Sequence, residues 1–188
     1  MNSLPAHLQP DCAACCGLCC VAPGFDAQQG FGYDKPAHEA CRHLQADFRC
    51  AIHATLGSEG FPGCTSYDCH GAGQRVTREF AGRDWQMEPE QAEAQYQAFM
   101  RMRPLHGLLA LLATARAHVH DDPWQQRLLA QEQAVEAHCA KTPAANDAAT
   151  SRELGAATAA LLAELGRTPG ILGLPHVRIA TDKCPPSL

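Results

Sequence analysis

Nine of the eleven cysteines fall within the first 69 residues, and five of these lie inside one stretch of nine residues. The nine are Cys12, Cys15, Cys16, Cys19, Cys20, Cys41, Cys50, Cys64 and Cys69. Thiolate sulfur is a soft ligand that selects zinc, iron–sulfur clusters or copper(I). The same region is interrupted throughout by glycine and proline, which is typical of loops rather than of a large apolar core. The sequence therefore predicts a metal-binding module, with these nine cysteines as candidate ligands.

The spacing of the first five cysteines indicates more than one metal. Cys12-x-x-Cys15 and Cys16-x-x-Cys19 each have the spacing of a metal-binding knuckle. Cys15 and Cys16 are adjacent, as are Cys19 and Cys20, and neighbouring side chains point in different directions. Such pairs can serve two metals, or two irons of one cluster. Because a tetrahedral site takes four ligands, nine thiols predict two sites or one polynuclear centre.

The choice of metal stays open between zinc and an iron–sulfur cluster, with copper(I) as a third alternative. Zinc supplies folding energy to small, loop-rich domains, and clustered cysteines suit iron–sulfur centres equally well. Unligated thiols this close together would be poised to oxidise. An odd total of eleven cysteines also fits a disulfide framework poorly.

Composition and charge indicate which kinds of partner and which cellular compartment to expect. The 188 residues carry a net charge of -5, with the lysines and arginines scattered, so we expect no nucleic-acid partner. The first eleven residues have neither a basic region nor an apolar region of a signal peptide, and no apolar run reaches the length of a membrane span. We therefore expect no membrane association and a cytoplasmic location, where thiols stay reduced.

The hydrophobic pattern divides the chain into two parts. Residues 1–85 form the predicted Cys-rich metal-binding module, and residues 86–188 form a predicted α-helical bundle with an irregular C-terminal tail. The expected fold is mainly α, with an irregular Cys-rich metal-binding module packed on a helical bundle.

Several helices are expected from periodicity and from capping residues. Pro104 should end or kink a helix that begins near Glu90, and Asp121 should cap the helix that follows it. Residues 75–80 fit a strand or a helix start equally. The first expected helix begins near Lys35-Pro36 or at His38 and runs past Leu44. The other expected helices cover residues 51–57, 90–103, 105–119, the segment from Pro123 onward, and 151–165.

Four motifs also resemble a known family. Cys16-Gly17-Leu18-Cys19-Cys20, Cys41-x-x-Leu44, Cys50-Ala51-Ile52-His53 and Gly60-Phe61-x-Gly63-Cys64-x-x-Tyr67 resemble the YkgJ-like "CxxCxxCC" family, described as a zinc- or iron-chelating domain with eight recurring cysteines. The segment Tyr67 to Val76 is similar to the N-terminal region of certain bacterial pentapeptide-repeat proteins, although this chain has no five-residue repeat. The resemblance implies eight ligands, with Cys15 as a ninth candidate: Cys12, Cys16, Cys19, Cys20, Cys41, Cys50, Cys64 and Cys69.

Two histidines lie beside cysteines of the cluster. His53 and His70 could each complete a mixed Cys/His site, but we favour capping or a place beside the ligands. Asp34, Lys35, Asp68 and Arg75 also flank cysteines, where they could hydrogen-bond to thiolates or balance their charge.

Three further features lie outside the cluster. His118 and His120 are two residues apart and so do not share a helix face, which favours a solvated helix end over a chelating pair. Cys139 is expected to be a thiol of the bundle core. Cys184 could fold back as a ligand.

The function predicted from these features is that of a metal-binding protein. It would act as a binding, adaptor or metal-handling module, with an unidentified protein partner docking on the helical part. The alternative is a redox-active iron–sulfur protein with an electron-transfer or oxidoreductive role. No catalytic residue is assigned, and Gly71-Ala72-Gly73 is too short to predict a phosphate loop.

Overall fold

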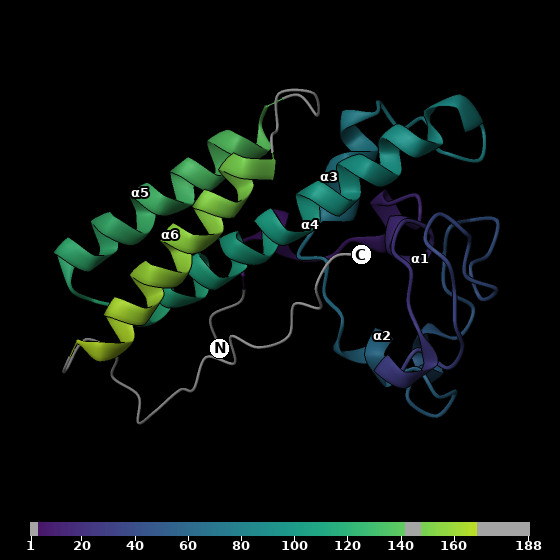
Figure 1. The fold of residues 1–188 in the computed structure, drawn as a ribbon, viewed down its shortest axis with the longest axis horizontal. Coiled ribbons are helices and arrows are strands. Elements are labelled where there is room, and N and C mark those ends of the chain that lie inside the picture. The colour runs from purple at the N-terminus through teal and green to yellow at the C-terminus, as the bar shows by residue number, and fades with distance from the viewer. Residues whose placement is uncertain (1–3, 142–147, 169–188) are drawn as a thin grey trace.

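The computed structural model describes residues 4–141 and 148–168 and is mainly helical. Within these residues β pairing is limited to two isolated antiparallel bridges, Phe25 with Lys35 and Leu44 with Cys50. The mainly α fold class is thus confirmed. Figure 1 shows loops and short helices at one end of the molecule and three long helices at the other.

The helical part contains helices α4, α5 and α6. Their bounds are Pro89–His118, Asp122–Cys139 and Ala148–Arg167. Helix α4 joins the two parts: its first half lies with α3 (Ala72–Glu79), and its second half lies with α5 and α6 (Figure 1).

Helix α4 continues through Pro104, so of the two predicted effects of Pro104, a helix end or a kink, the helix end is wrong. Proline removes one helical hydrogen bond and costs about 3 kcal/mol in a helix interior. Phe99, Met102, Leu105 and Leu109 lie on both sides of Pro104 and are at most 4% exposed. Burying such side chains stabilises by about 1.5–3 kcal/mol each, which together outweighs the proline.

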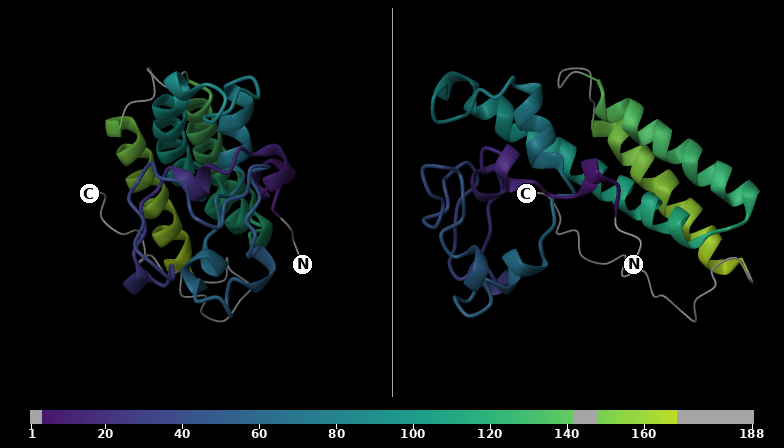
Figure 2. Two further views of the ribbon diagram at one scale, coloured as in Figure 1. Left: turned by 90° about the vertical axis from the view of Figure 1, so that its right-hand side faces the viewer. Right: turned by 180° about the vertical axis from the view of Figure 1, so that it is seen from behind.

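Helices α5 and α6 match their predictions. The Asp121 side chain accepts a hydrogen bond from the Trp124 amide at 3.1 Å, which confirms the predicted cap of α5. Trp124, Leu128 and Val135 are buried as the periodicity requires, whereas Leu129 is 39% exposed. Helices α5 and α6 lie side by side, as the right-hand view of Figure 2 shows.

The Cys-rich part, residues 4–85, contains short helices joined by loops. Besides α3 these include α1 (Leu18–Val21) and α2 (Pro62–Ser66). In the ambiguous segment at residues 75–80, the first five residues belong to α3 and Phe80 follows its last residue. The helix expected over residues 51–57 is reduced to a single 3-10 turn, His53–Thr55.

The helix predicted over residues 35–44 does not form. Lys35 instead pairs with Phe25 in an antiparallel bridge. His38 has a φ of 67°, in the left-handed region that a right-handed helix cannot use. The helix prediction is therefore wrong, because tertiary contacts of Lys35 and the backbone of His38 override local propensity.

One hydrophobic cluster connects the two parts. Leu8, Leu18 and Val21 of the Cys-rich part belong to the same buried cluster as Phe99 and Leu105 of α4. The core therefore crosses the boundary predicted after residue 85. No helix in the described residues has the length and apolar character needed to span a membrane.

Candidate metal centre

The stretch from Cys12 to Cys20 is anchored on α3 and then turned by a glycine. The Gln74 side chain accepts from the Asp11 amide at 2.8 Å and donates to the Gln9 carbonyl at 2.8 Å. Gly17 has a φ of 71°, and a Cβ there would lie 2.9 Å from Cδ1 of Leu44. Only glycine suits this turn without strain, and it directs the chain into α1.

Helix α1 separates its side chains between the core and the thiol cluster. Leu18 and Val21 are fully buried in the hydrophobic cluster. Cys19 and Cys20 lie between them in sequence and are partly exposed. The apolar anchors therefore fix the direction of both thiols.

A first group of four thiols surrounds a small cavity. The cavity is lined by Cys12, Cys15, Cys19 and Cys69, and Phe99 contributes to its wall. Burial raises the pKa of Cys12, and the neighbouring Cys69 raises it further. We call these four cysteines the first thiol set.

Cys15 fits closely against α3. Its Sγ lies 2.6 Å from the position that a Cβ on Gly73 would take, so a side chain at this position would displace the sulfur. Burial raises the pKa of Cys15 to about 11, and the amides of Leu18 and Gly17 partly offset this effect. Amides two and three residues after a cysteine can stabilise its thiolate once the proton is lost.

A second group of four thiols consists of Cys20 on α1 and the three cysteines Cys41, Cys50 and Cys64 that follow it in the chain. Cys41 is held by its amide, which donates to the Cys20 carbonyl at 2.9 Å. Burial raises the pKa of Cys64 to about 11, and the nearby Cys20, Cys41 and Cys50 add to this rise. Cys50 likewise has a pKa raised by burial and then by Cys20 and Cys41. We call these four cysteines the second thiol set.

The Tyr33 hydroxyl donates a hydrogen bond to Cys41 Sγ at 3.3 Å and accepts one from the Arg42 amide at 3.0 Å. A hydroxyl donor aimed at a sulfur favours the thiolate form. No sequence pattern pointed to Tyr33. Its only signal was a position eight residues before a cysteine.

The two sets meet at Cys19 and Cys20, whose sulfurs are 3.9 Å apart. The hydrogen bond between them, together with burial, holds the pKa of Cys19 well above its usual value. The same hydrogen bond lowers the pKa of Cys20, and the nearby Lys35 ammonium lowers it further. Cys19 therefore retains its proton while Cys20 is the more acidic member of the pair.

Lys35 is a buried cation beside the second set. Its side chain is 4% exposed, and Nζ donates to the carbonyls of Val21, Pro36 and Glu39 at 3.3, 2.9 and 2.7 Å. All three donors of an ammonium group can thus be satisfied. The Phe25 ring lies 5.0 Å from Nζ.

The electrostatics of Lys35 connect it to the thiols. Burial lowers the pKa of Lys35, and the charges of Cys41 and Cys20 oppose this shift. Buried charges require compensation, and the groups that supply negative charge near Lys35 are Cys41, Cys20 and Glu39. Of the four charged residues expected near the cysteines, Lys35 has the clearest contact with them.

The other three charged residues are used elsewhere. Asp34 accepts from the Ala27 amide at 2.8 Å, and Asp68 accepts from the His70 amide at 2.6 Å. Arg75 forms ion pairs with Glu79 and Glu136 at 3.2 and 2.8 Å.

Cys16 lies apart from both sets. Its Sγ is 3.3 Å from Thr77 Oγ1 and 3.7 Å from Gln95 Oε1. Its carbonyl accepts from Trp85 Nε1 at 2.8 Å, and the side chain is 3% exposed. The structure thus brings Cys15 to the first thiol set and packs the adjacent Cys16 into the core between α3 and α4.

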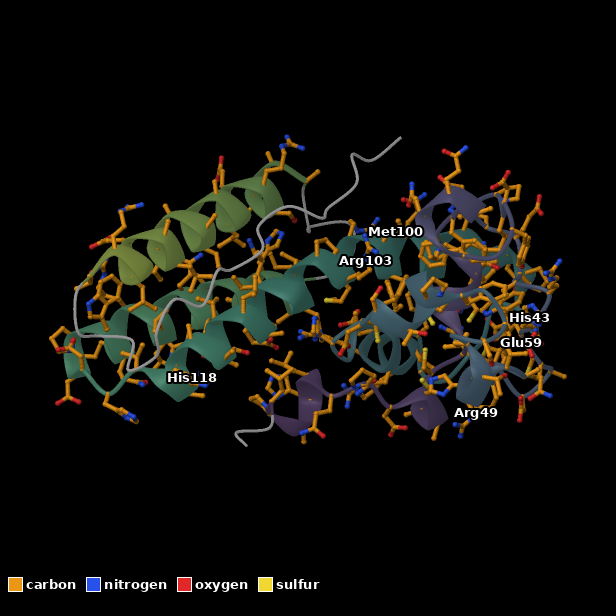
Figure 3. All side chains as sticks on the ribbon, turned by 90° about the horizontal axis from the view of Figure 1, so that it is seen from below. His43, Arg49, Glu59, Met100, Arg103 and His118 are labelled. Atoms are coloured by element: carbon orange, nitrogen blue, oxygen red, sulfur yellow. The ribbon has the colours of Figure 1, made fainter. Side chains whose placement is uncertain are left out.

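The remaining cysteines and histidines lie away from the thiol sets or at their edge. Cys139 is fully buried in the core cluster, and burial raises its pKa to about 12. His53 is exposed, and His118 lies at the opposite end of the molecule from Arg49 (Figure 3). The predicted role of Cys184 lies outside the described residues.

The backbone carbonyl of His70, and not its side chain, makes the contact with α4. Its carbonyl lies 2.6 Å from Nδ1 of His106, a side chain that is 1% exposed. Burial lowers the pKa of His106, which therefore stays neutral at neutral pH. His70 thus connects the segment after Cys69 to α4.

The thiol sets are gathered but do not have ligating geometry. Across residues 4–141 and 148–168, no group of three or more His, Cys, Asp or Glu side chains is arranged so that it could hold a metal ion. All ten cysteines in these ranges carry free thiols.

One relative shares a large part of the chain. "Uncharacterized protein YybG" of Bacillus subtilis (strain 168) is 41% identical over 115 residues. The match covers 61% of this chain and 41% of that protein, so the chain spans less than half of the relative's length. No family model and no solved structure matches the chain.

Proposed function

We propose that this chain is a metal-binding protein whose Cys-rich part holds zinc or an iron–sulfur centre through cysteine thiolates. The observation that carries the proposal is the scarcity of other stabilising groups around the gathered thiols. From residue 23 to residue 70, the buried residues are Lys35, Cys41 and Phe61. Fixing each backbone residue costs about 1–2 kcal/mol, and so few buried side chains cannot offset that cost over such a length.

Metal–thiolate bonds would supply the missing stabilisation. Cys41, Cys50 and Cys64 lie on three separate segments of this poorly buried region. Cys20 lies on α1, which Leu18 and Val21 anchor to the core. A metal bound by thiolates from all four would fasten each loop to α1. Structural zinc contributes roughly 10–16 kcal/mol of folding free energy in small domains.

The environment of the thiols supports the same proposal. Tyr33, Lys35 and the amides after Cys15 can each stabilise a thiolate. Groups of this kind around the ligands tune metal affinity. Cys139 contrasts with them, because it lies in the apolar core cluster.

The proposal includes the resemblance to the YkgJ-like family and a cytoplasmic location. A reducing compartment would keep the thiols available for metal. The helical part would remain free to dock on a protein partner.

Purification without oxygen, followed by elemental analysis and a visible spectrum, tests the proposal. We expect stoichiometric zinc in a colourless protein, or iron with acid-labile sulfide and broad visible absorbance. The second outcome would select the iron–sulfur alternative and its redox role. A protein that contains no metal, and takes up none from zinc or from ferrous iron with sulfide, would overturn the proposal.

A further inference from the structure

We infer that His106 of α4 is a positioning residue for the Cys69 thiol, because its buried imidazole holds the backbone turn that follows Cys69. This inference rests on the proposed function and deepens it, since it gives a residue of the helical part a role in placing one candidate ligand. Cys69 lines the small cavity of the first thiol set. The turn at residues 69–71 directly precedes α3 and connects this thiol to it.

The turn contains two consecutive residues in the left-handed region. His70 has a φ of 46° and Gly71 has a φ of 79°. A residue with a side chain is strained in this region and persists there only where the surrounding structure holds it. Glycine adopts the region without strain, and a Cβ at Gly71 would clash with the His7 carbonyl, so only glycine fits. The turn therefore depends on contacts that fix the backbone of His70.

Three hydrogen bonds hold the two peptide groups on either side of the His70 Cα. The Cys69 carbonyl accepts from the Ala72 amide at 2.9 Å, and the His70 amide donates to the Asp68 carboxylate at 2.6 Å. These two bonds hold the peptide group between Cys69 and His70. The His70 carbonyl belongs to the next peptide group and lies 2.6 Å from Nδ1 of His106. Of the three bonds, the one from His106 joins the turn to a distant part of the chain.

The burial and the protonation of the His106 ring suit this role. A carbonyl can only accept a hydrogen bond, so Nδ1 of His106 must carry a proton. The side chain is buried, and within the described residues Nε2 has no hydrogen-bond partner. Because an unpaired buried nitrogen is destabilising, packing alone does not explain a histidine here, whereas the bond to His70 does. Leu105 and Leu109 are buried in the core cluster and fix this part of α4.

Loss of the bond from His106 should let His70 leave the left-handed region. The peptide group that His70 shares with Cys69 would then be released, and the thiol would move away from the cavity wall. The bond would thus pre-organise Cys69 for metal, because the backbone that carries the thiol is ordered before the metal binds.

Three substitutions of His106 separate the hydrogen bond from packing. In His106→Asn the amide nitrogen can take the place of Nδ1 and keep the donor, whereas in His106→Gln it takes the place of Nε2. His106→Leu removes both ring nitrogens. The readout is the rate at which iodoacetamide alkylates Cys69 in the reduced, metal-free protein, followed by peptide mass spectrometry. We expect a rate about tenfold above that of the wild type in His106→Gln and His106→Leu, and a rate close to the wild type in His106→Asn.

Zinc affinity, measured by competition with a chromophoric chelator, is the second readout. It should fall about tenfold in His106→Leu and recover in His106→Asn. His138→Leu is the matched control, because His138 is also buried but its Nε2 lies 3.0 Å from Ser151 Oγ within the helical part. This control should unfold at a lower urea concentration and leave both the Cys69 alkylation rate and the zinc affinity unchanged.

Alkylation of Cys69 at the wild-type rate in His106→Gln and His106→Leu would overturn the inference, as would a fast rate in His106→Asn. Nitrogen-15 NMR of the wild-type imidazole removes any dependence on variant folding. The ring should carry its proton on Nδ1, and an Nε2–H tautomer would overturn the inference because Nδ1 could not donate. A wild-type protein that binds no metal would overturn the proposed function, whereas alkylation and NMR need no metal and test the contact by itself.

Discussion

The helical part and the Cys-rich part of this protein differ in the side chains that they bury. In the helical part, periodic apolar side chains such as Phe99, Leu109 and Leu128 are buried in a common core. In the Cys-rich part, long loops and the short helix α2 connect α1 to α3 (Figure 2), and from residue 23 to residue 70 the buried apolar side chains are those of Cys41 and Phe61. The contrast teaches that one chain can combine a region ordered by a large apolar core with a region that has few buried side chains, and under the proposed function the second region depends on metal for its order.

Metal removal should therefore affect the two parts unequally, and this is the largest effect we expect. Chelation should remove roughly 10–16 kcal/mol of stabilisation per zinc-like site. Amide hydrogen exchange should then lose protection across residues 23–70 and retain it in α5. Unchanged protection in both parts after complete metal removal would contradict the proposal that the Cys-rich part alone depends on metal.

Matched substitutions of two cysteines give the next largest effect. Cys20→Ala should abolish metal binding at the second thiol set and loosen the loops attached to it. Cys139→Ala should leave metal content unchanged, because this thiol only fills space in the core, and should cost about 1–2 kcal/mol. Elemental analysis and denaturant unfolding of both variants provide the readouts. Equal metal loss in the two variants would contradict the separation of roles.

Acidification should weaken metal binding in the Cys-rich part while the helical core is less affected. Burial raises the pKa of Cys15 and Cys64 to about 11, so both hold a proton in the metal-free protein at neutral pH. A metal must displace these protons, and its affinity falls as the pH falls. We expect about a tenfold loss per pH unit for each such thiol.

Proton release on adding zinc to a weakly buffered, metal-free sample measures this linkage. Titrations at two pH values give the corresponding affinities. Metal uptake without proton release, at an affinity that does not change with pH, would mean that thiols of this kind are not the ligands.

Removal of the buried cation should have the smallest effect on metal binding. Lys35→Met should weaken metal binding by the second thiol set about tenfold, equivalent to about 1.4 kcal/mol, because the thiolates lose a nearby positive charge. The carbonyls of Val21, Pro36 and Glu39 would also lose their donor. Arg49→Met is the matched control, since this exposed side chain lies by Cys12.

Competition with a chromophoric chelator compares the metal affinities of Lys35→Met and Arg49→Met. Urea unfolding of both variants reports any general loss of stability. Rescue by Lys35→Arg would assign the effect to charge. Equal affinities in Lys35→Met and the wild-type protein would show that the cation has a structural role alone.

The sequence predicted the helical part well because its stabilising features are local. The spacing of Leu105, Leu109 and Leu112 specified the buried face of α4, and Asp121 specified the start of α5. Pro104 misled the prediction because tertiary burial on both sides outweighs the local cost of proline.

The Cys-rich part was less predictable because its arrangement depends on contacts distant in sequence. Residue spacing identified the thiols as a group but could not separate Cys15 from Cys16. That separation depends on Gly73 and Thr77, which lie about sixty residues away. The helix predicted over residues 35–44 failed for the same reason, since Lys35 is used in contacts with α1.

X-ray absorption at the K-edge of the bound metal tests the central claim most directly, because it reports the ligand atoms themselves. The account predicts a shell of four sulfurs, at about 2.3 Å if the metal is zinc. A shell made of oxygen or nitrogen alone, at about 2.0–2.2 Å, would contradict it.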